Sequence, residues 1–197
     1  LICRAKKGGQ YIIFIGGVIL LSKINSIITE NYLKNIKENL YFERKRASVS
    51  MQDLANEIAS FSNANGGVIA VGITDEGNIE GFNNYGINKL NDFQKVITNY
   101  LSPTPNYKIE LIEVENIKNE KDNILLFHIE PVLNFIVRNN KDEVYLRQGD
   151  SSIKLNAEQV RSLEYEKGER NFESEVLSMS SIYDLDLEVM EIYKDKI

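Results

Sequence analysis

The chain has 197 residues, 43% of them hydrophobic and 26% charged, which is enough for one ordinary hydrophobic core with extensions and too little for two large ones. Its net charge of −6 argues against a nucleic-acid partner, but the charge is unevenly distributed. Residues 1–50 hold nine cations and three anions, whereas residues 171–197 hold seven anions and two cations. The composition therefore still allows a basic surface near residues 44–46.

The chain has a single cysteine, Cys3, and a single histidine, His128. These counts exclude an intrachain disulfide bond, a zinc site built from Cys and His, and most mechanisms that pair a nucleophile with histidine. Any catalysis must then depend on carboxylates. A single thiol fits the reducing cytoplasm, where we expect the protein to reside. His128 lies between Phe127 and Ile129, and we interpret it as a half-buried sheet residue rather than an acid or base.

The N-terminal part of the chain begins with an apolar stretch, residues 11–21. It is far shorter than the ~20 residues that a membrane-spanning helix requires, so we expect no membrane partner. Two apolar runs joined by Gly16 and Gly17 favour a β-hairpin within an N-terminal extension of residues 1–26, with a helix as the alternative. Residues 24–37 then have apolar positions at irregular helical spacing, which predicts a surface helix.

Residues 40–46 are predicted to form a short strand, in which Glu43 and Lys45 share one face because side chains alternate along a strand. The next segment has the clearest local signal, since Ser50 and Asp53 form a capping box that begins a helix. The pair Gly66-Gly67 is expected to end this helix as a C-cap and a tight packing point. The apolar run at residues 68–73 predicts a strand covered on both faces.

The second half of the chain alternates between predicted strands and helices. The segments are a helix at residues 87–101, strands at 108–115, 124–129, 135–138 and 143–147, and a helix at 157–167. We therefore expect an α+β fold, with a mixed β-sheet flanked by helices.

Three motifs in this order resemble those of the Schlafen AlbA-like (AlbA_2) domain family, across about residues 27–168. The first is a Glu, four residues, then Glu-x-Lys, at residues 38–45; the second is SFSNANGG at residues 60–67, followed by the strand and GITDEG. The third is YLRQGDSS at residues 145–152. Residues 169–197 resemble the acidic linker or the start of a C-terminal region in longer members, such as RecG-like proteins and transcriptional regulators.

The resemblance also implies a candidate site. In some Schlafen proteins three acidic residues form a metal-dependent RNA-cleaving centre, and the matching positions here are Glu38, Glu43 and Asp75. Carboxylates brought together repel one another unless a divalent cation such as Mg²⁺ or Mn²⁺ compensates them. Such an ion could position water and stabilise charge on a scissile phosphate, while Lys45 holds a phosphate oxygen. These four residues are the candidate catalytic residues, and the three acids are the candidate metal ligands.

The same residues have a simpler interpretation. Glu38 and Glu43 could be solvated surface acids paired with Lys37 and Lys45, and Asp75 could do no more than open a turn.

Four cations are candidates for nucleic-acid binding: Arg44, Lys45, Arg46 and Arg147. We expect them to form a basic surface. For Arg147, a salt bridge to Asp150 is the alternative to a phosphate contact.

Three functions follow from these observations. The preferred one is a divalent-metal-dependent endoribonuclease acting on structured RNA, and the alternative is a noncatalytic DNA-binding module of a transcriptional regulator within a longer protein. A third class, a protein-interaction or homodimerisation module, agrees best with the net acidity. RNA is the preferred ligand, with DNA as the alternative.

Overall fold

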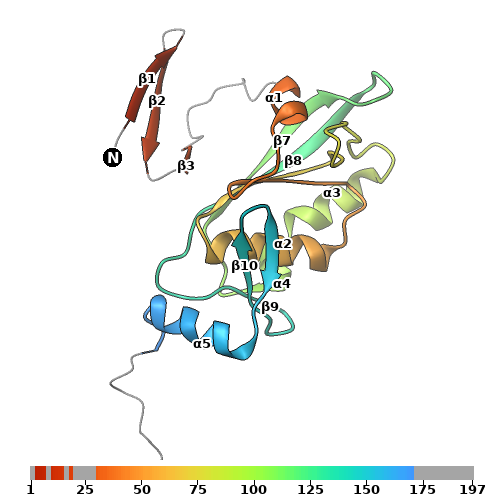
Figure 1. The fold of residues 1–197 in the computed structure, drawn as a ribbon. Coiled ribbons are helices and arrows are strands. Elements are labelled where there is room, and N and C mark those ends of the chain that lie inside the picture. Colours follow the sequence, from red (N-terminus) through yellow and green to blue (C-terminus); the bar gives the residue numbers. More distant parts are fainter. Residues whose placement is uncertain (1–2, 8–9, 16–17, 20–29, 171–197) are drawn as a thin grey trace, which may run out of the picture.

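The computed structural model describes residues 3–7, 10–15, 18–19 and 30–170 (Figure 1). Its centre is a four-stranded mixed sheet in the order β4-β5-β8-β7. The strands are β4 (Phe42–Lys45), β5 (Gly67–Val71), β8 (Lys121–Ile129) and β7 (Tyr107–Glu115). Strands β4 and β5 are parallel, while β8 is antiparallel to both of its neighbours. The expected α+β class with a mixed sheet and flanking helices is confirmed.

Helix α2 (Met51–Asn63) makes the crossover between the parallel strands β4 and β5. The Ser50 side chain accepts a hydrogen bond from the Asp53 N–H, which confirms the predicted N-cap. At the other end, Gly66 has φ 70° and its N–H donates to the Phe61 carbonyl at 2.8 Å. A Cβ on Gly67 would lie 2.5 Å from the Tyr41 carbonyl oxygen. The glycine pair is therefore the helix end and tight packing point that the sequence predicted.

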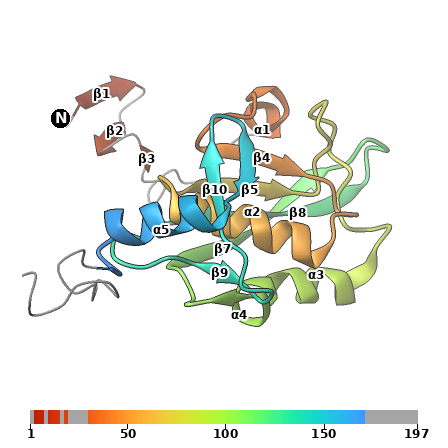
Figure 2. The same cartoon turned by 60° about the horizontal axis from the view of Figure 1, so that its bottom comes forward.

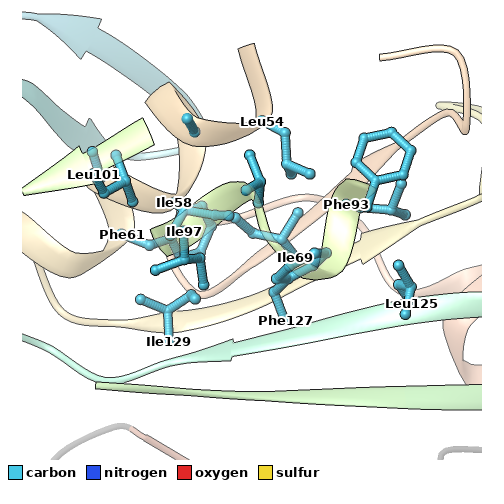
Figure 3. Close-up of a cluster of buried hydrophobic side chains, with 14 of the residues drawn as sticks. Leu54, Ile58, Phe61, Ile69, Phe93, Ile97, Leu101, Leu125, Phe127 and Ile129 are labelled. Atoms are coloured by element: carbon cyan, nitrogen blue, oxygen red, sulfur yellow. The ribbon is translucent and has the colours of Figure 1, made fainter. Parts of the chain in front are cut away.

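The main hydrophobic core lies between α2 and one face of the sheet. Figure 3 shows Leu54, Ile58 and Phe61 of α2 gathered with Ile69 of β5 and Phe127 of β8. Helices α3 (Gly86–Gln94) and α4 (Val96–Tyr100) contribute further residues to this core. A second cluster covers the opposite face of the sheet. Its buried residues are Leu33, Phe42, Ala70, Ile73, Ile79, Val114, Ile124 and Leu126. The sheet is thus covered on both faces.

The remaining described elements complete the arrangement (Figure 2). They are α1 (Glu30–Asn35), β6 (Leu101–Ser102), β9 (Arg138–Asn139), β10 (Tyr145–Gln148), β11 (Ser151–Lys154) and α5 (Ala157–Glu166). Strands β10 and β11 form an antiparallel hairpin that packs against α2. The small strands β6 and β9 pair with each other.

Near the N-terminus, β1 (Cys3–Lys7), β2 (Gln10–Ile15) and β3 (Val18–Ile19) form a small antiparallel sheet. The pairing of β2 with β3 is the arrangement expected of a hairpin at Gly16-Gly17, although the two glycines themselves lie outside the described residues. Part of the predicted helix at residues 24–37 and the predicted acidic segment at residues 169–197 also lie outside them, apart from residues 169 and 170. No helix in the described ranges is long and apolar enough to cross a membrane.

Two of the predicted elements differ from the structure. The single helix expected at residues 87–101 is interrupted at Lys95, which separates α3 from α4. The strand expected at residues 135–138 is wrong apart from its last residue. There the N–H of Ile136 donates to the Glu169 carboxylate at 2.6 Å and that of Val137 to the Asn63 amide oxygen at 2.8 Å. Side chains therefore satisfy this backbone in place of a neighbouring strand.

Candidate nucleic-acid interface

The candidate residues of β4 divide between the two faces of the sheet, because side chains alternate along the strand. Glu43 and Lys45 lie on the α2 side, as predicted. Arg44 points to the opposite side, where it is buried at 5% exposure. This contradicts the expectation that Arg44 forms part of a basic surface. The reason is that β4 is covered on both faces, so its charged sequence, FERK, does not mark a solvated strand.

Glu43 is the centre of a buried charge network with Lys45 and Arg147. One of its carboxylate oxygens accepts from the Lys45 ammonium at 2.6 Å, and the other accepts from the Arg147 guanidinium at 2.5 Å. Only 1% of the Arg147 side chain is exposed, and its guanidinium lies 4.6 Å from the centre of the Phe61 ring. The expectation of a surface Arg147 is therefore wrong. Its partner is Glu43, 104 residues away, in place of the neighbouring Asp150.

Glu57, on α2, is a member of this network that sequence reasoning missed. Its carboxylate lies 3.2 Å from the Lys45 ammonium and 3.5 Å from the Arg147 guanidinium. It also accepts a hydrogen bond from the Ser152 hydroxyl, which lies 2.6 Å from the Ser60 hydroxyl. Two anions and two cations thus neutralise one another and join β4, α2 and the β10–β11 hairpin. The only hint in the sequence is that Glu57 adjoins the apolar stripe of α2.

For both Glu43 and Lys45, burial and ion pairing shift the pKa in opposite directions. Burial raises the pKa of Glu43 above its ordinary value, because desolvation outweighs the hydrogen bonds from Lys45 and Arg147. The pKa of Lys45 is also raised: desolvation opposes this, but the hydrogen bond to Glu43 and the charge of Glu57 together exceed it. Lys45 therefore remains a cation at neutral pH.

Glu38 and Asp75 are both connected to Arg44 and not to Glu43. The carboxylate of Glu38 accepts a hydrogen bond from the Arg44 backbone N–H at 3.1 Å. The Arg44 guanidinium donates to the backbone carbonyl of Asp75 at 2.8 Å and to that of Ile36. The Asp75 side chain is exposed. The buried Arg44 side chain therefore links the segment before β4 to the segment after β5.

These contacts do not fit a metal centre built from Glu38, Glu43 and Asp75. Each oxygen of Glu43 already accepts from a cation, and one oxygen of Glu38 accepts from the sheet backbone. Within the ranges that the structure describes, no group of three or more His, Cys, Asp or Glu side chains is placed to hold a metal ion. The crossover does align β4 with β5, but it brings Lys45, not Glu43, opposite Val71 at the end of β5.

Lys45 and Arg46 are the predicted nucleic-acid contacts that reach solvent. The Lys45 side chain is 25% exposed, and that of Arg46 is 56% exposed. Arg46 lies directly after β4, and its guanidinium donates to the Glu80 carboxylate at 2.9 Å. That contact holds the pKa of Glu80 below its ordinary value. The expected basic surface of four cations is therefore reduced to two, each of which already has an acidic partner.

The amino-acid sequence is similar to a known protein family. The sequence model of a family described as Schlafen, AlbA_2 matches residues 30–156, which is more than half of the chain. A solved structure, that of the DIP2311 protein from Corynebacterium diphtheriae, is similar at 16% identity and a TM-score of 0.46 over 65% of this chain. The chain spans 24% of that protein. A comparison with curated proteins gave no match.

Proposed function

We propose that this chain, which belongs to the Schlafen AlbA_2 family, is a nucleic-acid-binding module that does not cleave its ligand. The family is associated with nucleic-acid binding. The observation that carries the noncatalytic part of the proposal is the pairing of Glu43 with Lys45 and Arg147, which uses both carboxylate oxygens. A buried carboxylate held by two cations favours a structural role over a ligand or a base.

The proposed contact surface is the C-terminal end of β4, where Lys45 and Arg46 reach solvent. Both side chains would approach the phosphodiester backbone that RNA and DNA share. Such contacts position a nucleic acid without reading its sequence. Arg46 is the more accessible of the two, and because its end of the ion pair with Glu80 is exposed, the guanidinium can turn from Glu80 to a phosphate.

The test is a fluorescence anisotropy titration of the full chain with a labelled RNA hairpin and a labelled DNA duplex of matched length. Replacing Arg46 with Gln removes one phosphate contact and should weaken binding about 3- to 10-fold, with a shallower dependence on salt. The control is Arg161→Gln on α5, an exposed arginine far along the chain from β4. Equal affinities for the two variants would remove this surface from the proposal. The two ligands distinguish RNA from DNA.

The alternative is the metal-dependent endoribonuclease with Glu38, Glu43, Asp75 and Lys45 as catalytic residues. It requires Glu43 to leave Arg147, and Asp75 to turn towards it. That rearrangement would leave the buried Arg147 guanidinium without its closest anionic partner, at a cost of about 3 kcal/mol or more. We therefore rank this function second.

A further inference from the structure

The two edges of the central sheet are protected to different degrees. On β4, which has four residues, the Glu38 carboxylate covers the backbone N–H of Arg44. On the opposite edge, β7 has nine residues, and no strand in the described ranges pairs with its outer side. Long open edges are places where another strand adds to a sheet.

The hydrogen bonds at the two ends of β7 show which residues face outward. At one end the Glu130 N–H donates to the Asn106 carbonyl, and at the other the Asn116 N–H donates to the Glu120 carbonyl. Antiparallel pairs alternate between bonded and non-bonded positions. Even-numbered residues of β7 therefore bond to β8, and odd-numbered residues direct their N–H and C=O groups to the open edge.

The open edge also carries two large exposed hydrophobic side chains. Tyr107 is 37% exposed and Leu111 is 48% exposed, and both belong to the odd-numbered set. On the other face of the same stretch are Lys108 and Glu110, two opposite charges at alternate positions. All four are placed symmetrically around Ile109.

We propose that β7 pairs antiparallel with β7 of a second copy of this chain, with Ile109 on the two-fold axis. In this register Tyr107 lies opposite Leu111 of the second copy, so each exposed hydrophobic side chain covers the other. Lys108 lies opposite Glu110 in both directions, which gives two cross-strand ion pairs. Tyr107, Ile109 and Leu111 supply the outward N–H and C=O groups in each copy, so these groups pair with one another across the axis. The inference does not depend on the proposed function.

Other registers are less complementary. With Glu110 on the axis, the two copies of Glu110 face each other as like charges. With Leu111 on the axis, Glu110 faces Ile112 and Lys108 faces Val114, so neither charge is matched. Charge and exposure therefore select the same register, and the occupant they select is a second copy.

The test uses charge reversals and sedimentation equilibrium on the full chain. The wild-type protein should reach twice its monomer mass of 22.5 kDa as its concentration rises. Lys108→Glu alone, or Glu110→Lys alone, should weaken the dimer about tenfold, because each places two like-charged pairs across the axis. Circular dichroism confirms that each variant folds.

A mixture of the two variants separates the interface from effects within one strand. Each variant has like charges at positions 108 and 110 of its own chain, yet in the mixed dimer both cross-strand pairs are again opposite in charge. The mixture should therefore dimerise about as tightly as wild type. As a matched control, Glu113→Lys reverses an exposed charge on β7 outside the overlap and should leave the dimer intact.

Three results would overturn the proposal. One is a wild-type chain that stays monomeric up to about 1 mM. Another is a dimer that the single reversals leave unchanged, since it would use another surface. The third is a mixture that dimerises no better than its separate components.

Discussion

Burial and the nearby carboxylate of Glu110 have opposite effects on the pKa of His128. It lies half-buried on β8, as the sequence predicted, and its imidazole is 3.1 Å from the Glu110 carboxylate. Burial lowers its pKa below the ordinary value of 6.5, because desolvation of the charged ring exceeds the stabilisation by Glu110, and Lys108 lowers it further. The folded protein therefore resists protonation of this ring.

The consequence for stability has a definite sign. Because the unfolded chain binds the proton more readily, the contribution of His128 is present above pH 6.5 and is lost as the pH falls through the lower folded pKa. We expect the free energy of unfolding to decrease between roughly pH 7 and pH 5, and the decrease to shrink in His128→Gln. As the chain has one histidine, NMR titration of its imidazole gives the folded pKa directly. A folded pKa above 6.5 would contradict this.

At the same scale, the arginines show what the sequence could not reveal. Alternation along β4 correctly placed Glu43 beside Lys45, since it is a local property of the backbone. It could not show that Arg44 is buried on the other face, or that Arg147 crosses 104 residues of sequence to reach Glu43. Buried ion pairs between distant segments have no periodic signal, and the predicted basic surface failed for this reason.

Among the elements, those with local signals were predicted well. Helix α2 begins at the Ser50 N-cap and has an apolar stripe, and β5 is a continuous apolar run between glycines. The β10–β11 hairpin was only half predicted: β10 was expected, whereas β11 lies between the predicted strand at residues 143–147 and the predicted helix at 157–167, where no element was expected. Its strand character comes from pairing with β10 and from docking against α2, which are tertiary effects.

The docking of this hairpin can be tested at Glu43. In Glu43→Gln the buried Arg147 loses its charged partner, so we expect a loss of about 3 kcal/mol in the free energy of unfolding. Urea denaturation followed by circular dichroism measures this, and hydrogen exchange should show faster exchange in β10 and β11. The control Glu113→Gln, on the exposed part of β7, should change stability by less than ~0.5 kcal/mol.

A second replacement tests whether the lost stability of Glu43→Gln comes from the unpaired charge of Arg147. Adding Arg147→Met to Glu43→Gln removes the orphaned charge, so the double variant should be more stable than Glu43→Gln alone. If Glu43→Gln were as stable as wild type, the network would not be what holds the hairpin to β4 and α2.

Binding of a divalent ion to the folded chain would stabilise the whole molecule. A site that binds the folded chain alone stabilises it by about 2.7 kcal/mol when the ligand is at 100 times its dissociation constant. In a protein of this size, that corresponds to an increase in Tm of about 5 °C or more. Thermal unfolding therefore detects a metal site without any assumption about the substrate.

We expect no such increase with ~5 mM Mg²⁺ or Mn²⁺, an excess of about 100-fold over a 50 μM site, because Glu43 is already neutralised by Lys45 and Arg147 and Glu38 is bonded to the sheet edge. Glu43→Gln and Asp75→Asn should respond to the ions in the same way as wild type. A stabilisation seen in wild type and lost in both variants would mean that the carboxylates leave their present partners to bind the ion. The ion would then supply the charge that now comes from Arg147, and the endoribonuclease would replace the noncatalytic module as the preferred function.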